Sequence, residues 1–268
     1  MKNFLNAFWF VLAAALLGGC AKNSSADFQG YIEGEYVYVA APLGGALTNL
    51  AVARGDHVKE GQLLFALERQ SEADALAEAG KNLAQARASL ALSESVFQRR
   101  KELRDSPSGV ISAEELDQAR AQRDADASHV AALKAALDKA KWAFDQKQQF
   151  APTNAVVHDT LYRQGEWLAA GNPVVVLLPP DNLKVRFFVP QDKLPEIKTG
   201  RTVSVRCDGL AHAVNATINY ISTEAEYTPP VIYSRETRAN LVFMIEAKIP
   251  PADAPDVRPG QPADVSLN

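Results

Sequence analysis

The sequence of 268 residues predicts an elongated α+β protein, in which a long helical hairpin divides a β-domain into two halves and a further β-rich region follows. Three observations predict this architecture. A short β-pattern occurs twice at an offset of 110 residues, a heptad pattern fills the space between the two copies, and strand-like alternation follows the second copy.

The repeated β-pattern consists of an Ala-Pro pair followed by two glycines that lie six residues apart. Pro opens a strand, short apolar runs form strands, and the glycines suit tight turns that need positive φ. One copy is a small meander that cannot bury its apolar face alone, whereas two facing copies can. A chance coincidence of turn patterns is the alternative. The repeat is carried by Pro42, Gly55 and Gly61 in the first copy and by Pro152, Gly165 and Gly171 in the second.

Residues 70–148, between the two copies, are rich in strong helix formers. A turn signal at 105–109 divides them, and Ser112 then offers a capping box for the second helix. Two arms, each on the order of 50 Å long, must therefore fold back antiparallel as a coiled coil. A rod of this kind presents its tip, or else serves as a structural or dimerising coiled coil. The heptad positions are Leu76, Leu83, Leu90 and Phe97 in the first arm and Leu116, Val130, Leu137 and Phe144 in the second, where Arg123 interrupts the pattern.

The N-terminal residues are predicted to lie outside the fold. Residues 1–19 resemble a signal peptide, because the apolar stretch Ala7–Leu17 is shorter than the ~20 residues that a membrane span needs. Leu17-Gly18-Gly19-Cys20 resembles a lipobox, which implies a lipidated Cys20 and a linker over 20–30. An ordinary secretory signal or an uncleaved anchor is the alternative. The other thiol, Cys207, is expected to be a small buried hydrophobe in a strand.

Composition and motifs argue against several classes of function. The formal net charge of -4 and the absence of Lys/Arg blocks argue against a nucleic-acid partner. The four histidines are scattered without zinc-ligand spacing, and no phosphate-binding loop or hydrolase signature occurs. We therefore expect no catalytic residue, no metal site and no cofactor, and we expect that the protein is not an enzyme.

The repeat resembles the biotinyl/lipoyl half-motif, with the two halves at 31–69 and 149–182. In carrier enzymes the halves are joined by a tight hairpin that presents a modified Lys. Here the insert 70–148 takes that place, and no Lys lies on a short connection between the halves. This departure removes the carrier chemistry.

A lipobox, a split lipoyl domain and a helical hairpin at the split together resemble the HlyD-type periplasmic membrane fusion proteins, also called adaptors. The resemblance covers nearly the whole mature chain. It implies that residues 183–268 form a C-terminal antiparallel β-barrel domain, whose closing strand lies in Arg258–Val265. The segment 221–241 is most similar to that of YbhG-like adaptors, which are paired with ABC-type exporters.

This resemblance implies a periplasmic adaptor subunit of an export or efflux system, held at the inner membrane by lipidated Cys20. It would link an inner-membrane transporter, of ABC type in preference to a proton-driven one, to an outer-membrane TolC-like channel. Several copies, for example a hexamer, would form a ring. Ala21 leaves sorting to the outer membrane open.

The resemblance also implies a docking site for the channel at the hairpin tip. In adaptors that dock on TolC-like channels the tip carries an Arg, a Leu four residues on, and a Ser seven beyond that. Arg99 and Leu103 match the first spacing, whereas Ser112 lies two residues further on. The expected docking residues are Arg99, Arg100, Leu103, Val110, Ile111 and Ser112.

Two other functions compete with this one. The first is a carrier-like protein that bears lipoate or biotin on a Lys. The second is a structural coiled-coil lipoprotein of the envelope, which would form a dimer without a transporter.

Overall fold

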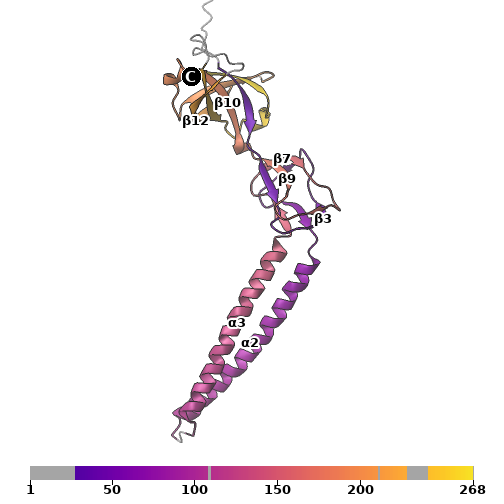
Figure 1. Cartoon of the computed structure of the whole chain (residues 1–268), viewed down its shortest axis with the longest axis vertical. Helices are drawn as coiled ribbons and strands as arrows, with labels where there is room; N and C mark the ends of the chain where they lie inside the picture. The colour runs from indigo at the N-terminus through magenta and orange to yellow at the C-terminus, as the bar shows by residue number, and fades with distance from the viewer. Residues whose placement is uncertain (1–27, 108–109, 211, 228–240, 268) are drawn as a thin grey trace, which may run out of the picture. The chain divides into compact units, whose positions relative to one another are not determined.

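The computed structural model describes residues 28–107, 110–210, 212–227 and 241–267. The predicted signal peptide, Cys20 and the first part of the linker lie outside these residues. The chain divides into two compact units, with the boundaries after Glu35 and after Pro179. One unit contains the central β-domain with its helical hairpin, and the other contains a β-barrel (Figure 1). The predicted α+β class, with a helical hairpin and β-rich domains, is confirmed.

The central β-domain consists of two four-stranded sheets, in the orders β2-β9-β7-β4 and β6-β5-β3-β8. Each sheet mixes strands from before and after the hairpin, so neither half of the repeat folds on its own. The first half contributes β2 (Val37–Ala40), β3 (Gly45–Leu50), β4 (His57–Val58) and β5 (Leu63–Leu67); the second contributes β6 (Gln148–Phe150), β7 (Ala155–Thr160), β8 (Trp167–Leu168) and β9 (Pro173–Leu178).

The internal repeat is visible in individual hydrogen bonds between the halves. The Gly55 amide donates to the Val157 carbonyl at 2.8 Å, and the Gly165 amide, 110 residues later, donates to that of Leu47 at 2.8 Å. The second glycines behave alike: Gly61 and Gly171 have φ of 77° and 81°. The predicted positive-φ turns are thus confirmed, and each half closes the turns of the other.

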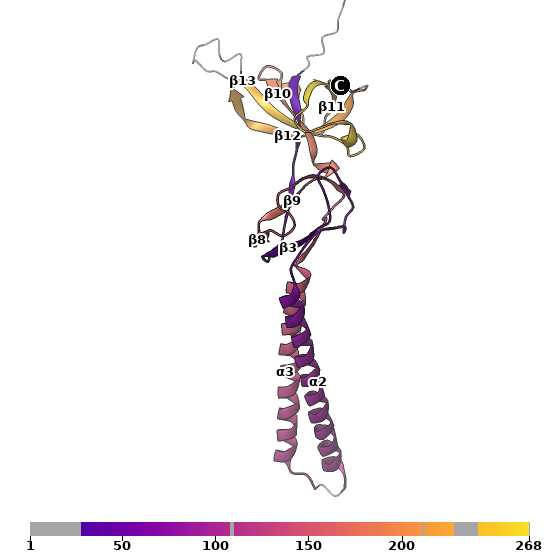
Figure 2. The ribbon, with the colours of Figure 1, turned by 90° about the vertical axis from the view of Figure 1, so that its right-hand side faces the viewer.

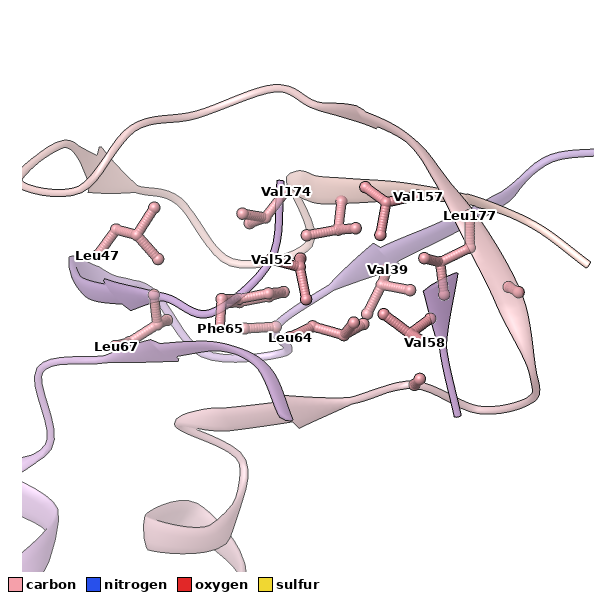
Figure 3. Packing of buried hydrophobic residues seen from close by; sticks show 14 of the residues in the cluster. Val39, Leu47, Val52, Val58, Leu64, Phe65, Leu67, Val157, Val174 and Leu177 are labelled. Atoms are coloured by element: carbon pink, nitrogen blue, oxygen red, sulfur yellow. The ribbon is translucent and has the colours of Figure 1, made fainter. Parts of the chain in front are cut away.

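The core of this domain is apolar and tightly closed. Interdigitated side chains from both halves fill the space between the sheets (Figure 3). Leu64, Phe65, Val174, Val175 and Leu177 are all completely buried. Because the apolar faces of both halves meet here, this core holds together the two chain segments from which the hairpin starts and to which it returns.

The hairpin consists of α2 (Gln70–Asp105) and α3 (Ala113–Asp145), which run side by side in both views (Figures 1 and 2). The predicted break at 105–109 is confirmed, because α2 ends at Asp105; residues 108–109 lie outside the described part. Every predicted heptad position is buried or half-buried. The seam is closed most tightly by Leu83, Ala86, Ser93 and Phe97 of α2 and by Leu116 and Ala119 of α3.

The second unit is a closed antiparallel barrel with the strand order β1-β10-β13-β12-β11-β14. The barrel implied by the resemblance is therefore present. It contains a 3-10 turn at Leu194–Glu196, and Cys207 is 2% exposed, as expected of a small buried hydrophobe. The strands are β1 (Phe28–Gly34), β10 (Leu183–Pro190), β11 (Thr202–Cys207), β12 (Val214–Tyr227), β13 (Leu241–Lys248) and β14 (Pro262–Leu267).

The sequence assignment of one segment is wrong in this unit. Residues 28–34 were assigned to a linker and to the first lipoyl half, but β1 pairs with β10 and β14 and belongs to the barrel. Ile32 is fully buried there. Glu224 and Glu226 lie on β12, which continues past an irregularity between Ile221 and Ala225.

Candidate functional site

The tip of the hairpin is organised around Ser112, the N-cap of α3. Its hydroxyl accepts a hydrogen bond from the Glu115 amide at 3.2 Å, and the Glu115 carboxylate accepts one from the Ser112 amide at 2.9 Å. This is the predicted capping box, in which two amides that a helix start leaves unpaired are satisfied reciprocally. The bonds from Ser112, aided by the charge of Arg100, lower the pKa of Glu115.

The predicted docking residues have two different structural roles. Arg100 is turned across the hairpin, where its Nη1 donates to the Glu115 carbonyl at 2.9 Å, and Ser112 is used in the cap. Leu103 is 42% exposed and Val110 is 66% exposed. The structure therefore brings Arg100 together with the cap and leaves two large apolar side chains in solvent.

The two remaining docking candidates are also near the tip. Arg99 is exposed on α2, one turn before Leu103, and Ile111 is half-buried directly before the cap. The candidate contact surface therefore consists of Arg99, Leu103 and Val110, and Arg100, Ile111 and Ser112 support it. We call Arg99, Leu103 and Val110 the tip surface.

A small apolar cluster between α2 and α3 lies next to the tip surface, on the side toward the base of the hairpin. Phe97, Leu116 and Ala119 are each at most 6% exposed and pack together. The guanidinium of Arg123 lies over the Phe97 ring at 4.5 Å and also reaches Glu94 at 3.9 Å. The interruption of the heptad by Arg123 is thus explained, because the cation covers the open face of an aromatic ring.

The base of the hairpin is held by side chains that the sequence analysis did not single out. Arg69, which precedes α2, donates from Nη1 to the Gln148 side chain at 2.8 Å and lies 4.6 Å from the centre of the Phe144 ring. Lys147, which follows α3, is 5% exposed and pairs with Glu72 of α2 at 3.0 Å. The repeat could have indicated Lys147. The equivalent residue of the first half, 110 positions earlier, is the apolar Val37, so a cation at this position distinguishes the second half.

The connection between the lipoyl halves is a long helical hairpin, and its exposed Lys side chains, such as Lys101 and Lys141, lie on the two helices. The halves are joined through α2 and α3, and Lys147, at the return to the domain, is buried. Within the described residues, no group of three or more His, Cys, Asp or Glu side chains could hold a metal ion. None of the helices in the described part of the chain combines the length and apolarity that a membrane crossing requires.

Comparisons with known proteins agree with this geometry. Residues 75–147 match the family model described as RND MFP, alpha-helical hairpin domain. A UPF0194 membrane protein of Enterobacter sp. (strain 638) is 27% identical over 96% of this chain and 95% of its own length. The UPF0194 membrane protein YbhG of Salmonella gallinarum is also 27% identical, over 96% of this chain and 94% of its own.

Solved structures show the same fold. The membrane fusion protein Spr0693 from Streptococcus pneumoniae R6 superposes with a TM-score of 0.66 at 18% identity, covering 91% of this chain and 99% of that one. MacA from Actinobacillus actinomycetemcomitans gives 0.60 at 15% identity, covering 91% and 78%. Together with the match of residues 75–147 to the hairpin-domain model, these structures confirm the resemblance to the membrane fusion proteins in fold.

Proposed function

We propose that this chain, which has the hairpin and the fold of a membrane fusion protein, is a non-enzymatic periplasmic adaptor that links an inner-membrane transporter to an outer-membrane channel. One observation carries the proposal: a two-helix hairpin leaves the β-domain at the split of its repeat and ends in the exposed apolar side chains of Leu103 and Val110. Exposed apolar side chains at the end of a rod are suited to contact with a partner.

The proposed work of the adaptor is geometric. The barrel and the lipoyl domain would contact the transporter, and the tip surface would contact the channel. Several copies in a ring, such as a hexamer, would be needed to enclose a path for the substrate. We favour an ABC-type transporter because the segment 221–241 resembles that of YbhG-like adaptors; residues 228–240 lie outside the described part of the chain.

The proposed anchor is the lipidated Cys20, which would hold the mature chain at the periplasmic face of the inner membrane. Two or more acyl chains are needed for stable anchoring, and a lipoprotein signal provides them. The hydrophobic N-terminal stretch and the Leu-Gly-Gly-Cys order support the proposal. Ala21 after the Cys makes the outer membrane the alternative site.

The test is purification of the full-length protein from membranes of its native host, with a tag at the C-terminus. The proposal expects an integral inner-membrane transporter to co-purify with the wild-type protein and with a Leu103→Ser/Val110→Ser variant. The outer-membrane channel should co-purify with the wild-type protein and not with the variant.

Two outcomes would contradict the proposal. A stable dimer with no transporter would favour the structural coiled-coil lipoprotein. An intact mass that places lipoate or biotin on a Lys would favour the carrier. The adaptor predicts added mass on Cys20 and none on any Lys.

A further inference from the structure

Lys147 is a buried cation that joins three separate elements at the base of the hairpin. It follows the C-cap of α3, and its ammonium lies 3.0 Å from the Glu72 carboxylate in the first turn of α2. The same ammonium donates to the Gly44 carbonyl at 2.8 Å, directly before β3. One side chain therefore connects both arms of the hairpin to the edge of the lipoyl domain.

The internal repeat identifies this arrangement as a departure from the basic domain. The position equivalent to Lys147 in the first half is Val37, a partly buried apolar residue that packs against the core. The first half therefore folds without a cation at this position. An apolar side chain is sufficient at this position in the first half. We therefore relate Lys147 to the feature that only the second half has, which is the return of the chain from α3 to the β-domain.

A second departure accompanies the first. The second half has Ala155, which is buried, where the first half has Gly45. A Cβ on Gly45 would lie 3.2 Å from the Lys147 ammonium, which is tighter than most Cβ contacts. Both departures thus concern the same atom: one half introduces the ammonium, and the other half leaves room for it.

A buried ion pair is a poor means of adding stability, because the cost of removing two charges from water offsets most of their attraction. Such a pair can instead fix the orientation of the elements that carry its partners, because a buried ammonium must keep its carboxylate and carbonyl partners in place. Glu72 moves with α2 and Gly44 moves with β3. Tilting the hairpin against the domain would therefore pull one partner away from Lys147.

We infer that Lys147, with Glu72 and the space at Gly45, is a positioning device that fixes the direction in which the hairpin leaves the lipoyl domain. Arg69 supports it from the other arm through Gln148 and Phe144. The lever is long: α2 has 36 residues, or about 54 Å at the α-helical rise. A tilt of about 10° at the base would move the tip by about 9 Å, roughly the width of a helix.

The test measures the direction of the hairpin in the full-length chain. Spin labels are placed on cysteines at the exposed positions Lys59, in the lipoyl domain, and Lys101, near the tip, in a Cys20→Ser/Cys207→Ala background. Double electron–electron resonance then gives the distribution of label–label distances. We expect a narrow distribution in this parent and a broader one in Lys147→Met/Glu72→Gln. A tilt of about 10° displaces Lys101 by about 8 Å, which is the upper limit of the change in label–label distance.

The double variant removes both charges and leaves neither one unpaired, so a loss of direction is separated from a loss of folding. Arg54→Met/Asp159→Asn is the matched control, because it removes an ion pair of 2.7 Å in the same domain whose Arg is 69% exposed. Its distance distribution should equal that of the parent.

Gly45→Ala is the second test, because it keeps both charges and only crowds the ammonium. It should also broaden or shift the distribution. Should Lys147→Met/Glu72→Gln fail to fold, as judged by circular dichroism, Gly45→Ala decides the question. An unchanged distribution in the folded variants would overturn the inference, whatever the partners of the tip prove to be.

Discussion

The two ends of the hairpin differ in how their charged and polar groups are used, although both expose apolar side chains: Trp142, near the end of α3, is 51% exposed. At the base, the charged side chain of Lys147 is buried and bonds to groups of the chain itself. At the tip, Leu103 and Val110 are apolar and stand in water, while the polar groups of Ser112 and Glu115 bond to each other. A charge that is buried and paired belongs to the architecture, whereas apolar side chains exposed at the tip are available to a partner.

The largest effect on stability is expected at the base. Lys147→Ala should lower the free energy of unfolding of the unit 36–179 by about 2–4 kcal/mol, because Glu72 loses its cation and a cavity remains. Urea unfolding followed by tryptophan fluorescence measures it, since Trp142 and Trp167 both lie in this unit.

Arg54→Ala is the control for the base, because it breaks an exposed ion pair in the same domain and should cost less than about 0.5 kcal/mol. An equal loss of unfolding free energy in Lys147→Ala and Arg54→Ala would mean that the buried ion pair at the base stabilises the unit no more than an exposed one.

A smaller and local effect is expected at the cap. Ser112→Ala should cost about 1 kcal/mol, because the Glu115 amide loses its acceptor. Hydrogen exchange should accelerate in the first turn of α3 and stay unchanged at the base of the hairpin. Ser112→Asn should retain slow exchange, since Asn is also a good N-cap. Acceleration along the whole hairpin would mean that the tip and the base are not independent.

The tip surface should contribute little to stability. Leu103→Ser should lower the free energy of unfolding by about 1 kcal/mol or less, because 42% of the residue is already exposed. Leu116→Ser is the matched comparison at the same end of the hairpin, and should cost at least about 2 kcal/mol, because Leu116 is 5% exposed and seals the cluster around Phe97. A large loss for Leu103→Ser would assign that residue to the seam.

The finest distinction between the two ends concerns pH. The bonds from Ser112 lower the pKa of Glu115 in the folded chain. The carboxylate therefore contributes its full stabilisation of the folded tip at a pH above the pKa that Glu115 has in the unfolded chain. The contribution is lost as the pH falls through the lowered pKa, that is, below 4.5. An NMR titration of the Glu115 carboxyl should show this. Ser112→Ala keeps the amide hydrogen bond to the carboxylate and removes the hydroxyl hydrogen bond, so it should raise the pKa only part of the way toward its ordinary range. A titration that Ser112→Ala leaves unchanged would contradict the capping geometry.

The regular parts of the fold could be predicted because their patterns are local or repeated. The heptads of Leu83 and Phe97 and the turn glycines Gly55 and Gly165 report the hairpin and the lipoyl domain without any knowledge of distant pairing. The cap at Ser112 was likewise readable from four consecutive residues.

The errors came from pairing across large sequence separations. β1 belongs to the barrel because Tyr31 pairs with Arg186 and Pro262, and nothing in residues 28–34 alone indicates those partners. Lys147 was missed for a different reason. Its role depends on Glu72 and Gly44, which the chain brings to it only after both the hairpin and the β-domain have formed.

Site-specific photo-crosslinking in living cells tests the central claim most directly. A photoreactive residue at Val110, on the tip surface, is compared with one at Lys141, an exposed position near the base of α3. The account predicts a crosslink from Val110 to an outer-membrane channel subunit and none to that subunit from Lys141. Crosslinks to the channel from both positions, or no envelope partner from Val110, would contradict it.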